Sequence, residues 1–249
     1  MKSVIHNHYK SKAALLEESI KNFDVDDGYV LKQSRNSLKQ VYIDDWKINI
    51  KSFKKPNIFN KIIYRYFRKG KAQRSYEYAL RLIELGIGTP HPIAYFAESQ
   101  GLLFGRSFYI SEQLQYDLTY RELITDFNYP NHEEILRAFT RFTYTLHQKG
   151  VEFKDHSPGN TLIVKGSDDY RFYLVDLNRM NFRTLDFNAR MKNFARLTKY
   201  KSMVEVMSDE YAKCMQLPYD KVFNAMWNEV RKFRASFDRK RKIKKILGL

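Results

Sequence analysis

Residues 151–178 read VEFKDHSPGNTLIVKGSDDYRFYLVDLN and are the most informative part of the sequence about the fold. Two apolar runs in it, TLIV and FYLV, are separated by the polar sequence KGSDDY, which predicts a β-hairpin. If the turn is centred near Asp168, residues whose numbers sum to 336 face each other, so Asn160 lies opposite Asp176. Facing residues of an antiparallel ladder lie roughly 5 Å apart. An amide oxygen and a carboxylate at that distance suit a hard divalent cation, especially Mg²⁺ shared with phosphate oxygens.

A second carboxylate, Asp155, lies on the loop just before Asn160, where Pro158-Gly159 predicts a sharp bend. Asp155 could then project over the same metal and phosphate region. Phosphoryl transfer to a hydroxyl requires such a set of groups. One carboxylate orients the hydroxyl and accepts its proton, while an amide oxygen and another carboxylate hold metal ions that offset charge on the transferred group.

The rest of the chain predicts an α+β fold with two lobes in one domain, residues 1–249. Residues 1–113 contain several β-prone runs and a helical periodicity over 58–85, which predicts a small β-rich N-lobe. From about residue 114 to the C-terminus the pattern is mainly helical, apart from the hairpin. A helix is expected over 133–149, ended by Gly150.

Phosphoryl transfer also needs a cation on the nucleotide phosphates, and Lys51 is the candidate. In the strand-like run 48–53, Ile48 and Ile50 are expected to point into the core, and Lys51 to the opposite face. A lysine in that position needs a carboxylate to fix its direction. Glu77, on the following helix, is the first acidic residue after a long basic stretch, and Glu84 is a second acid on the same helix.

Composition and charge narrow the classes of protein and partner. The chain of 249 residues is 43% hydrophobic and has one cysteine, which excludes an internal disulfide and a cysteine-rich metal site. No signal sequence and no run of about 20 apolar residues is visible. The net charge of +16 favours a polyanionic partner, such as nucleic acid, anionic lipid or a phosphorylated substrate. Basic residues concentrate at 46–76 and 231–245.

The hairpin and its flanks resemble the catalytic core of the protein-kinase-like fold, and most closely the lipopolysaccharide core kinases. The resemblance covers about residues 34–197. It depends on four segments: DHSPGN at 155–160, DLNRM at 176–180, NFARL at 193–197 and GIGTPHP at 86–92. These kinases phosphorylate the inner-core sugar Kdo or a heptose. The resemblance implies ATP and Mg²⁺ as cofactors and a lipid-linked sugar acceptor at the cytoplasmic face of the bacterial inner membrane.

The resemblance also implies a role for each matching position. Asp155 corresponds to the catalytic base, Asn160 and Asp176 to the metal ligands, and Lys51 to the lysine on the α- and β-phosphates, with Glu77 as its partner. The remaining nucleotide contacts lie in two segments: the turn at 34–39, which includes Asn36 and Ser37 and covers the nucleotide, and the hinge from Glu112 to Leu114, whose backbone receives adenine.

Several protein-kinase features are replaced or missing. No G-x-G-x-x-G precedes Lys51, the H-R-D triplet appears as Phe153-Lys154-Asp155, and D-F-G appears as Asp176-Leu177-Asn178. No A-P-E segment follows, and 73 residues remain after Asp176. A regulated activation loop and a protein-substrate platform are therefore not expected, which favours a glycolipid or small-molecule acceptor.

The leading hypothesis is an ATP-dependent kinase that acts on Kdo of Kdo-lipid A. A heptose kinase, another small-molecule kinase, a kinase-like scaffold without chemistry and a basic nucleic-acid-binding protein are the alternatives. The last leaves the acidic hairpin without a purpose, so no nucleic acid is expected.

His156, beside Asp155, could contact substrate or be an exposed loop residue. The two basic segments could bind anionic lipid, which agrees with a peripheral protein at the inner membrane. The oligomeric state stays open.

Overall fold

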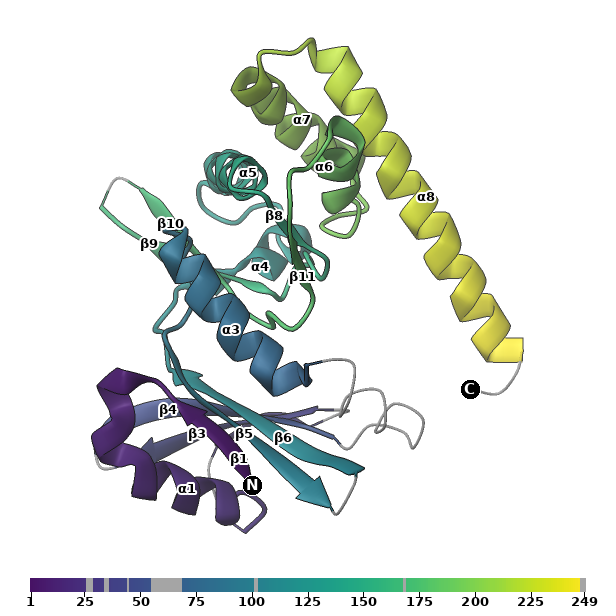
Figure 1. Cartoon of the computed structure of the whole chain (residues 1–249). Coiled ribbons are helices and arrows are strands. Elements are labelled where there is room, and N and C mark those ends of the chain that lie inside the picture. The colour runs from purple at the N-terminus through teal and green to yellow at the C-terminus, as the bar shows by residue number, and fades with distance from the viewer. Residues whose placement is uncertain are drawn as a thin grey trace. The chain divides into compact units, whose positions relative to one another are not determined.

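The computed structural model describes residues 1–25, 29–33, 36–43, 45–54, 69–100, 103–167 and 169–246. The chain forms two compact units (Figure 1). Unit 1 comprises residues 1–115 together with 176–178, and unit 2 comprises residues 116–175 and 179–249. The expected boundary near residues 113 and 114 lies within two residues of this division, but sequence patterns did not indicate that 176–178 group with unit 1.

Unit 1 is built on a six-stranded antiparallel sheet in the order β1-β5-β6-β4-β3-β2. The predicted β-prone runs form strands, and the N-terminal residues add β1, which sequence patterns did not predict. The strands are β1 (Lys2–Ile5), β2 (Tyr29–Gln33), β3 (Asn36–Ile43), β4 (Trp46–Phe53), β5 (Pro92–Gln100) and β6 (Leu103–Glu112).

Helices cover both faces of this sheet (Figure 1). On one face, η1 (Asn7–Lys12) and α1 (Ala13–Lys21) pack on a cluster that includes Ile48 and Ile50 of β4. On the other face, α3 (Lys71–Glu84) packs on Phe53. Because side chains alternate along a strand, Lys51 shares the face of Phe53, and its Nζ lies 5.5 Å from the centre of that ring. The predicted orientation of β4 is confirmed.

The helix predicted over 58–85 is described from Lys71 onward as α3. Residues 55–68, which hold much of the first basic segment, lie outside the described residues. Gly86 follows the helix with a φ of 64°, a left-handed conformation that glycine adopts without a Cβ penalty. The end of the helix is therefore where sequence reasoning placed it.

Unit 2 is mainly helical around one apolar core centred on Phe139 and Tyr211. The helix predicted over 133–149 is α5, and no helix in the described residues is long and apolar enough to cross a bilayer. The elements are β7 (Leu118–Thr119), α4 (Tyr120–Thr125), α5 (His132–Gln148), β8 (Val151–Phe153), β9 (Thr161–Lys165), β10 (Tyr170–Leu174), β11 (Met180–Phe182), α6 (Phe187–Asn193), α7 (Lys201–Met215) and α8 (Tyr219–Ile246).

The predicted hairpin exists as β9 and β10, but its predicted register is wrong by one residue. Tyr170 faces Lys165 and Leu174 faces Thr161, so facing residues sum to 335. The turn is closed by a hydrogen bond from the Gly166 N–H to the Asp169 carbonyl, 2.8 Å, which places its centre half a residue earlier. Asn160 therefore faces Val175, whose N–H donates to the Asn160 carbonyl at 3.0 Å. Asp176 follows as the next residue, beyond the ladder.

Two buried histidines of unit 2 make its stability depend on pH. Burial lowers the pKa of His147 to about 4, and burial followed by the nearby His147 lowers the pKa of His156 to about 3. The unfolded chain binds these protons near the ordinary value of 6.5, so it holds more protons than the folded state below that pH. Stability therefore falls as the pH drops from 6.5 toward 4, by up to about 1.4 kcal/mol per pH unit for each histidine.

Urea denaturation between pH 7 and pH 4.5 measures this dependence. His156→Leu replaces the buried imidazole with an apolar side chain of similar size and removes one titrating group, so it should roughly halve the slope. A slope unchanged by this substitution would show that His156 does not stay neutral in the folded protein.

Candidate active site

Lys51 and Asp176, far apart in sequence, form an ion pair within unit 1. The Lys51 Nζ lies 2.6 Å from the Asp176 Oδ1, and the Asn178 Nδ2 donates to the same oxygen at 2.6 Å. Asp176 has a φ of 61°, a left-handed conformation that Asp and Asn adopt more readily than most residues. This conformation turns the chain directly after β10. The structure thus brings into contact Lys51, which the sequence analysis assigned to the nucleotide phosphates, and Asp176, which it assigned to the metal.

The acidic partner predicted for Lys51 was Glu77, and this prediction is wrong. Glu77 on α3 instead pairs with Lys69, whose Nζ lies 2.7 Å from Oε2, and accepts a hydrogen bond from Gln73. Sequence order suggested Glu77 because it follows a basic stretch. Asp176, which lies 125 positions further on than Lys51, becomes the partner only through the fold.

The Asp155 carboxylate is held by two arginines of unit 2. Arg179 and Arg196 each donate from Nη1 to Oδ1 of Asp155, at 3.0 and 2.8 Å. Within the part of the chain that the structure describes, neither of these bonds nor any other hydrogen bond ends on Oδ2. The side chain is 16% exposed. A carboxylate fixed through one oxygen presents the other to an incoming hydroxyl, as a proton acceptor requires.

Asn160 stands at the other end of the same loop. Its Nδ2 donates to the Asp155 backbone carbonyl at 2.8 Å, so the amide nitrogen is turned toward the loop. The amide oxygen is then left for another partner. Gly159 beside it leaves room for Arg121 of α4, because a Cβ at Gly159 would lie 2.6 Å from the Arg121 Nη2.

Oxygen ligands for a metal exist in both predicted positions. The two contacts of Asp176 described above both use Oδ1, and the bond of Asn160 uses its nitrogen. Each side chain therefore keeps one oxygen for a cation. The described residues contain no cluster of three or more His, Cys, Asp or Glu side chains that could hold a metal ion. Mg²⁺ fits such a sparse set because it usually combines one or two protein oxygens with phosphate oxygens and water.

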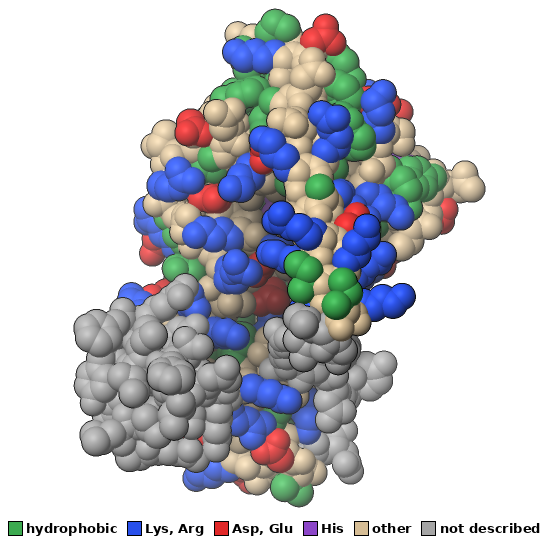
Figure 2. Space-filling view, turned by 90° about the vertical axis from the view of Figure 1, so that its right-hand side faces the viewer, with side chains coloured by type: hydrophobic (Ala, Val, Ile, Leu, Met, Phe, Trp, Pro, Cys, Tyr) green, Lys and Arg blue, Asp and Glu red, His purple; other side chains and the backbone are tan. Residues whose placement is uncertain are grey.

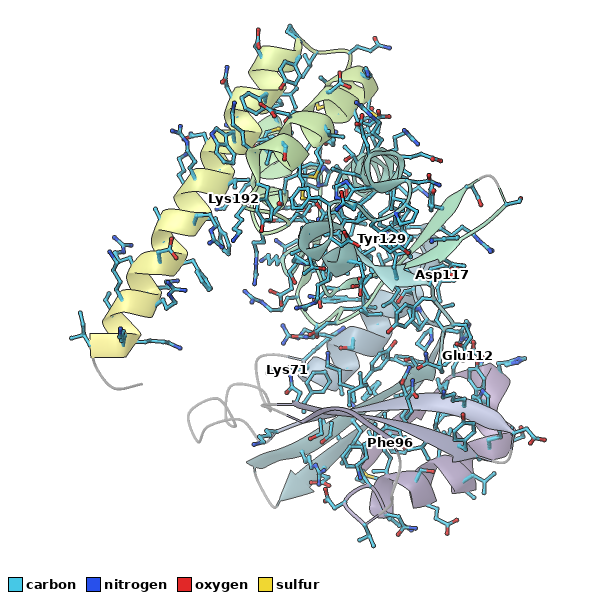
Figure 3. The ribbon with its side chains drawn as sticks, turned by 180° about the vertical axis from the view of Figure 1, so that it is seen from behind. Lys71, Phe96, Glu112, Asp117, Tyr129 and Lys192 are labelled. Carbon is cyan, nitrogen blue, oxygen red and sulfur yellow. The ribbon has the colours of Figure 1, made fainter. Side chains whose placement is uncertain are left out.

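The predicted nucleotide-binding segments are placed as follows. Asn36 and Ser37 are the first residues of β3 rather than part of a turn, and the two residues before them lie outside the described residues. Glu112, labelled in Figure 3, ends β6. Its N–H donates to the His91 carbonyl, and its side chain accepts a hydrogen bond from the Tyr9 hydroxyl at 2.7 Å. The Leu114 carbonyl accepts from the Gln113 side chain at 2.6 Å. Adenine recognition at 112–114 therefore needs backbone groups other than the Glu112 N–H.

Sequence reasoning missed both arginines of the Asp155 contact. Arg179 and Arg196 were noted inside the DLNRM and NFARL segments, but no role was given to either. His156 was expected to touch substrate or solvent, and it is buried between the rings of Phe139 and Phe153. Neither alternative for His156 is correct. A signal exists for Arg179, a basic residue directly after Asp176-Leu177-Asn178, whereas Arg196 follows Ala195 and has no such signal.

The second basic segment lies on α8, whose C-terminal half leaves the core of unit 2. Val222, Met226 and Val230 are buried, whereas Phe237 is 48% exposed and Ile246 is 81% exposed. Lys and Arg side chains are spread over the face of unit 2 that carries this helix, among hydrophobic, other polar and acidic ones (Figure 2). Nine of them lie between residues 231 and 245. The C-terminal half of α8 is therefore exposed and strongly positively charged.

Comparisons with known proteins give the family and the fold of this chain. The model of the lipopolysaccharide kinase (Kdo/WaaP) family matches residues 43–217, which is more than half of the chain. A search of curated proteins finds no match. Among solved structures, the fold is similar to a structure titled "WaaP in complex with acyl carrier protein", with a TM-score of 0.64 and 17% identity over 96% of this chain and 99% of that chain. The β-rich first part and the helical second part are those of a kinase-like fold.

Proposed function

Because the chain belongs to the lipopolysaccharide kinase (Kdo/WaaP) family, and is thus a phosphotransferase of lipopolysaccharide biosynthesis, we propose that it uses ATP to phosphorylate a hydroxyl of Kdo on Kdo-lipid A. The observation that carries this proposal is the state of Asp155. One of its oxygens is fixed by two guanidinium groups, and the other has no protein partner among the described residues. A carboxylate in this state is suited to orient a sugar hydroxyl and to accept its proton.

The proposed reaction transfers the γ-phosphoryl group of ATP to the sugar hydroxyl. The sugar hydroxyl oxygen forms a bond to the γ-phosphorus of ATP, and the bond from that phosphorus to the β-γ bridging oxygen breaks, which releases ADP. The proton of the hydroxyl passes to Oδ2 of Asp155. Asp155 contributes by holding the oxygen in line for attack, so part of the barrier is removed by orientation alone.

Three residues are proposed to bind MgATP. Lys51 is proposed to contact the α- and β-phosphates, and its ion pair with Asp176 holds the amine in place before the nucleotide arrives. Asn160 and Asp176 are proposed to hold Mg²⁺ through the oxygens that their hydrogen bonds leave open. Bound magnesium would offset the negative charge that develops on the transferred phosphoryl group.

The test is product analysis with defined acceptors. The purified protein is incubated with MgATP and either Kdo-lipid A or a heptosylated core, and the products are analysed by mass spectrometry. The proposal predicts one added phosphate on Kdo-lipid A, located on the Kdo fragment. Phosphate found on heptose alone would make the protein a heptose kinase, and no transfer to either acceptor would reject the proposed substrate class.

A nucleic-acid-binding protein was the alternative from another class, and the family match favours the kinase over it. The net charge of +16 then needs another explanation. An anionic membrane surface is the proposed one, since the proposed acceptor is embedded in lipid. We propose that the protein is a peripheral protein at the cytoplasmic face of the inner membrane. Among the described segments α8 is best suited to that contact, since its exposed end combines cations with Phe237 and Ile246.

This placement predicts that removing two cations from the exposed end of α8 weakens binding to anionic vesicles. Lys242→Gln with Lys245→Gln should lower the partition coefficient by roughly 30-fold, since each cation near the surface contributes about 1 kcal/mol. Lys10→Gln with Lys21→Gln gives the same net charge on exposed residues of unit 1 and should have little effect. Sedimentation with phosphatidylglycerol vesicles measures both pairs. If both double substitutions weaken vesicle binding equally, α8 contributes only through the net charge of the protein and is not the contact segment.

A further inference from the structure

The cluster around Asp155 carries more positive charge than is needed to hold one carboxylate. Two guanidinium groups surround a single Asp, which leaves one positive charge uncompensated. The exposed Lys154, next to Asp155 in the chain, adds another. A single arginine would already make a neutral pair. The surplus therefore points to an anion that comes from outside the protein.

The Arg196 side chain and the Arg179 backbone are held by contacts that do not involve the Asp155 side chain. The Arg196 Nη1 also donates to the Lys154 carbonyl at 3.1 Å, and its guanidinium carbon lies 5.7 Å from the centre of the Phe233 ring on α8. The backbone of Arg179 is tied to the same loop, because its carbonyl accepts a hydrogen bond from the Lys154 N–H at 3.1 Å. Arg196 is thus positioned next to the proposed base by its own contacts, and Arg179 by its backbone bond and its contact with Asp155.

Both arginines also keep donors for a ligand. Their bonds to Asp155 use Nη1 alone, and in the described ranges no protein acceptor is found for Nε or Nη2 of either residue. Arg179 is 56% exposed and Arg196 is 38% exposed, so a ligand can reach them. Paired guanidinium donors of this kind match the two oxygens of a carboxylate.

We propose that Arg179 and Arg196 bind the carboxylate of the acceptor sugar, so that the acceptor is a sugar acid and not a neutral heptose. This inference rests on the proposed kinase function and deepens it. We assign the anion to the acceptor and not to the nucleotide, because both arginines donate to Oδ1 of Asp155, the carboxylate proposed to receive the acceptor's proton. Nucleotide phosphate already has its own cation in Lys51 of unit 1.

The test compares two acceptors with the full-length protein. One is Kdo-lipid A, and the other is the same glycolipid with the Kdo carboxyl group reduced to an alcohol. We expect kcat/KM of the wild-type protein to be about 10–100-fold lower with the reduced acceptor, as hydrogen bonds to a charged group would give. Arg179→Gln and Arg196→Gln should cause a similar loss on Kdo-lipid A and a much smaller one on the reduced acceptor.

Arg183→Gln is the matched control. Arg183 is an exposed arginine of the same region, paired with Glu152, and its removal should leave both rates unchanged. Equal use of both acceptors by the wild-type protein overturns the inference. The inference also fails if the arginine variants lose the same factor in kcat/KM on both acceptors, because the arginines then only hold Asp155. It fails as well if the variants raise only the KM for ATP, because the arginines then bind the nucleotide. Transfer to neither acceptor by the wild-type protein rejects the proposed function itself.

Discussion

Replacing Asp155 with asparagine should reduce phosphotransfer to Kdo-lipid A by about 10²–10⁴-fold, the usual contribution of a positioned general base. Asparagine keeps the size and one oxygen of the side chain, so Arg179 and Arg196 retain an acceptor at Oδ1. What is lost is the charged oxygen that takes the proton. We expect the loss in kcat, with the KM for ATP nearly unchanged, because Asp155 is assigned to the acceptor.

Steady-state rates with both substrates varied, together with the thermal midpoint of unfolding, measure this effect. Asp209→Asn is a matched control, because Asp209 on α7 is also a carboxylate held by two cations, Arg137 and Lys213. It should keep full activity. An Asp155→Asn protein that transfers phosphate at the wild-type rate would remove the assigned base.

Replacing Asp176 with asparagine should lower kcat/KM for MgATP by about 10³-fold. The substitution removes a proposed magnesium ligand whose electrostatic contribution is several kcal/mol. It also removes the counter-charge of Lys51, which lies 2.6 Å away. Asparagine is chosen because it tolerates the φ of 61° at this position, whereas alanine would add backbone strain to the loss of charge.

The measurement is ATP binding by calorimetry with and without Mg²⁺, beside the kinetic assay. The wild-type protein should bind ATP more tightly when Mg²⁺ is present, and the Asp176→Asn protein should lose most of that gain. A variant that still responds fully to Mg²⁺ would place the metal on other residues.

Local patterns predicted the elements of this chain well. Alternation in β4 and helical periodicity in α5 depend on neighbours within a few residues, so Ile48, Ile50 and Lys51 could be oriented from sequence. The register of the hairpin was wrong because it depends on the turn, and the bond from Gly166 to Asp169 moves the centre by half a residue. In a strand, that difference changes which residue faces Asn160.

Ion pairs between residues far apart in sequence could not be predicted in the same way. Lys51 pairs with Asp176, and Asp155 with Arg196, because the fold brings together segments that no periodicity connects. His156 shows the reverse case. A histidine next to a catalytic loop looks functional in sequence, yet here the ring fills the core between Phe139 and Phe153. Polarity alone does not reveal which way a loop residue turns.

The grouping of 176–178 with unit 1 has a practical consequence for dissecting this protein. A fragment that ends at residue 115 would carry Lys51 but lack Asp176, the carboxylate that pairs with it. Expressed alone, such a fragment should be a poor nucleotide binder even if its sheet folds. Truncation and domain-swap experiments should therefore keep the polypeptide whole, or graft the Asp176–Asn178 tripeptide together with the sheet.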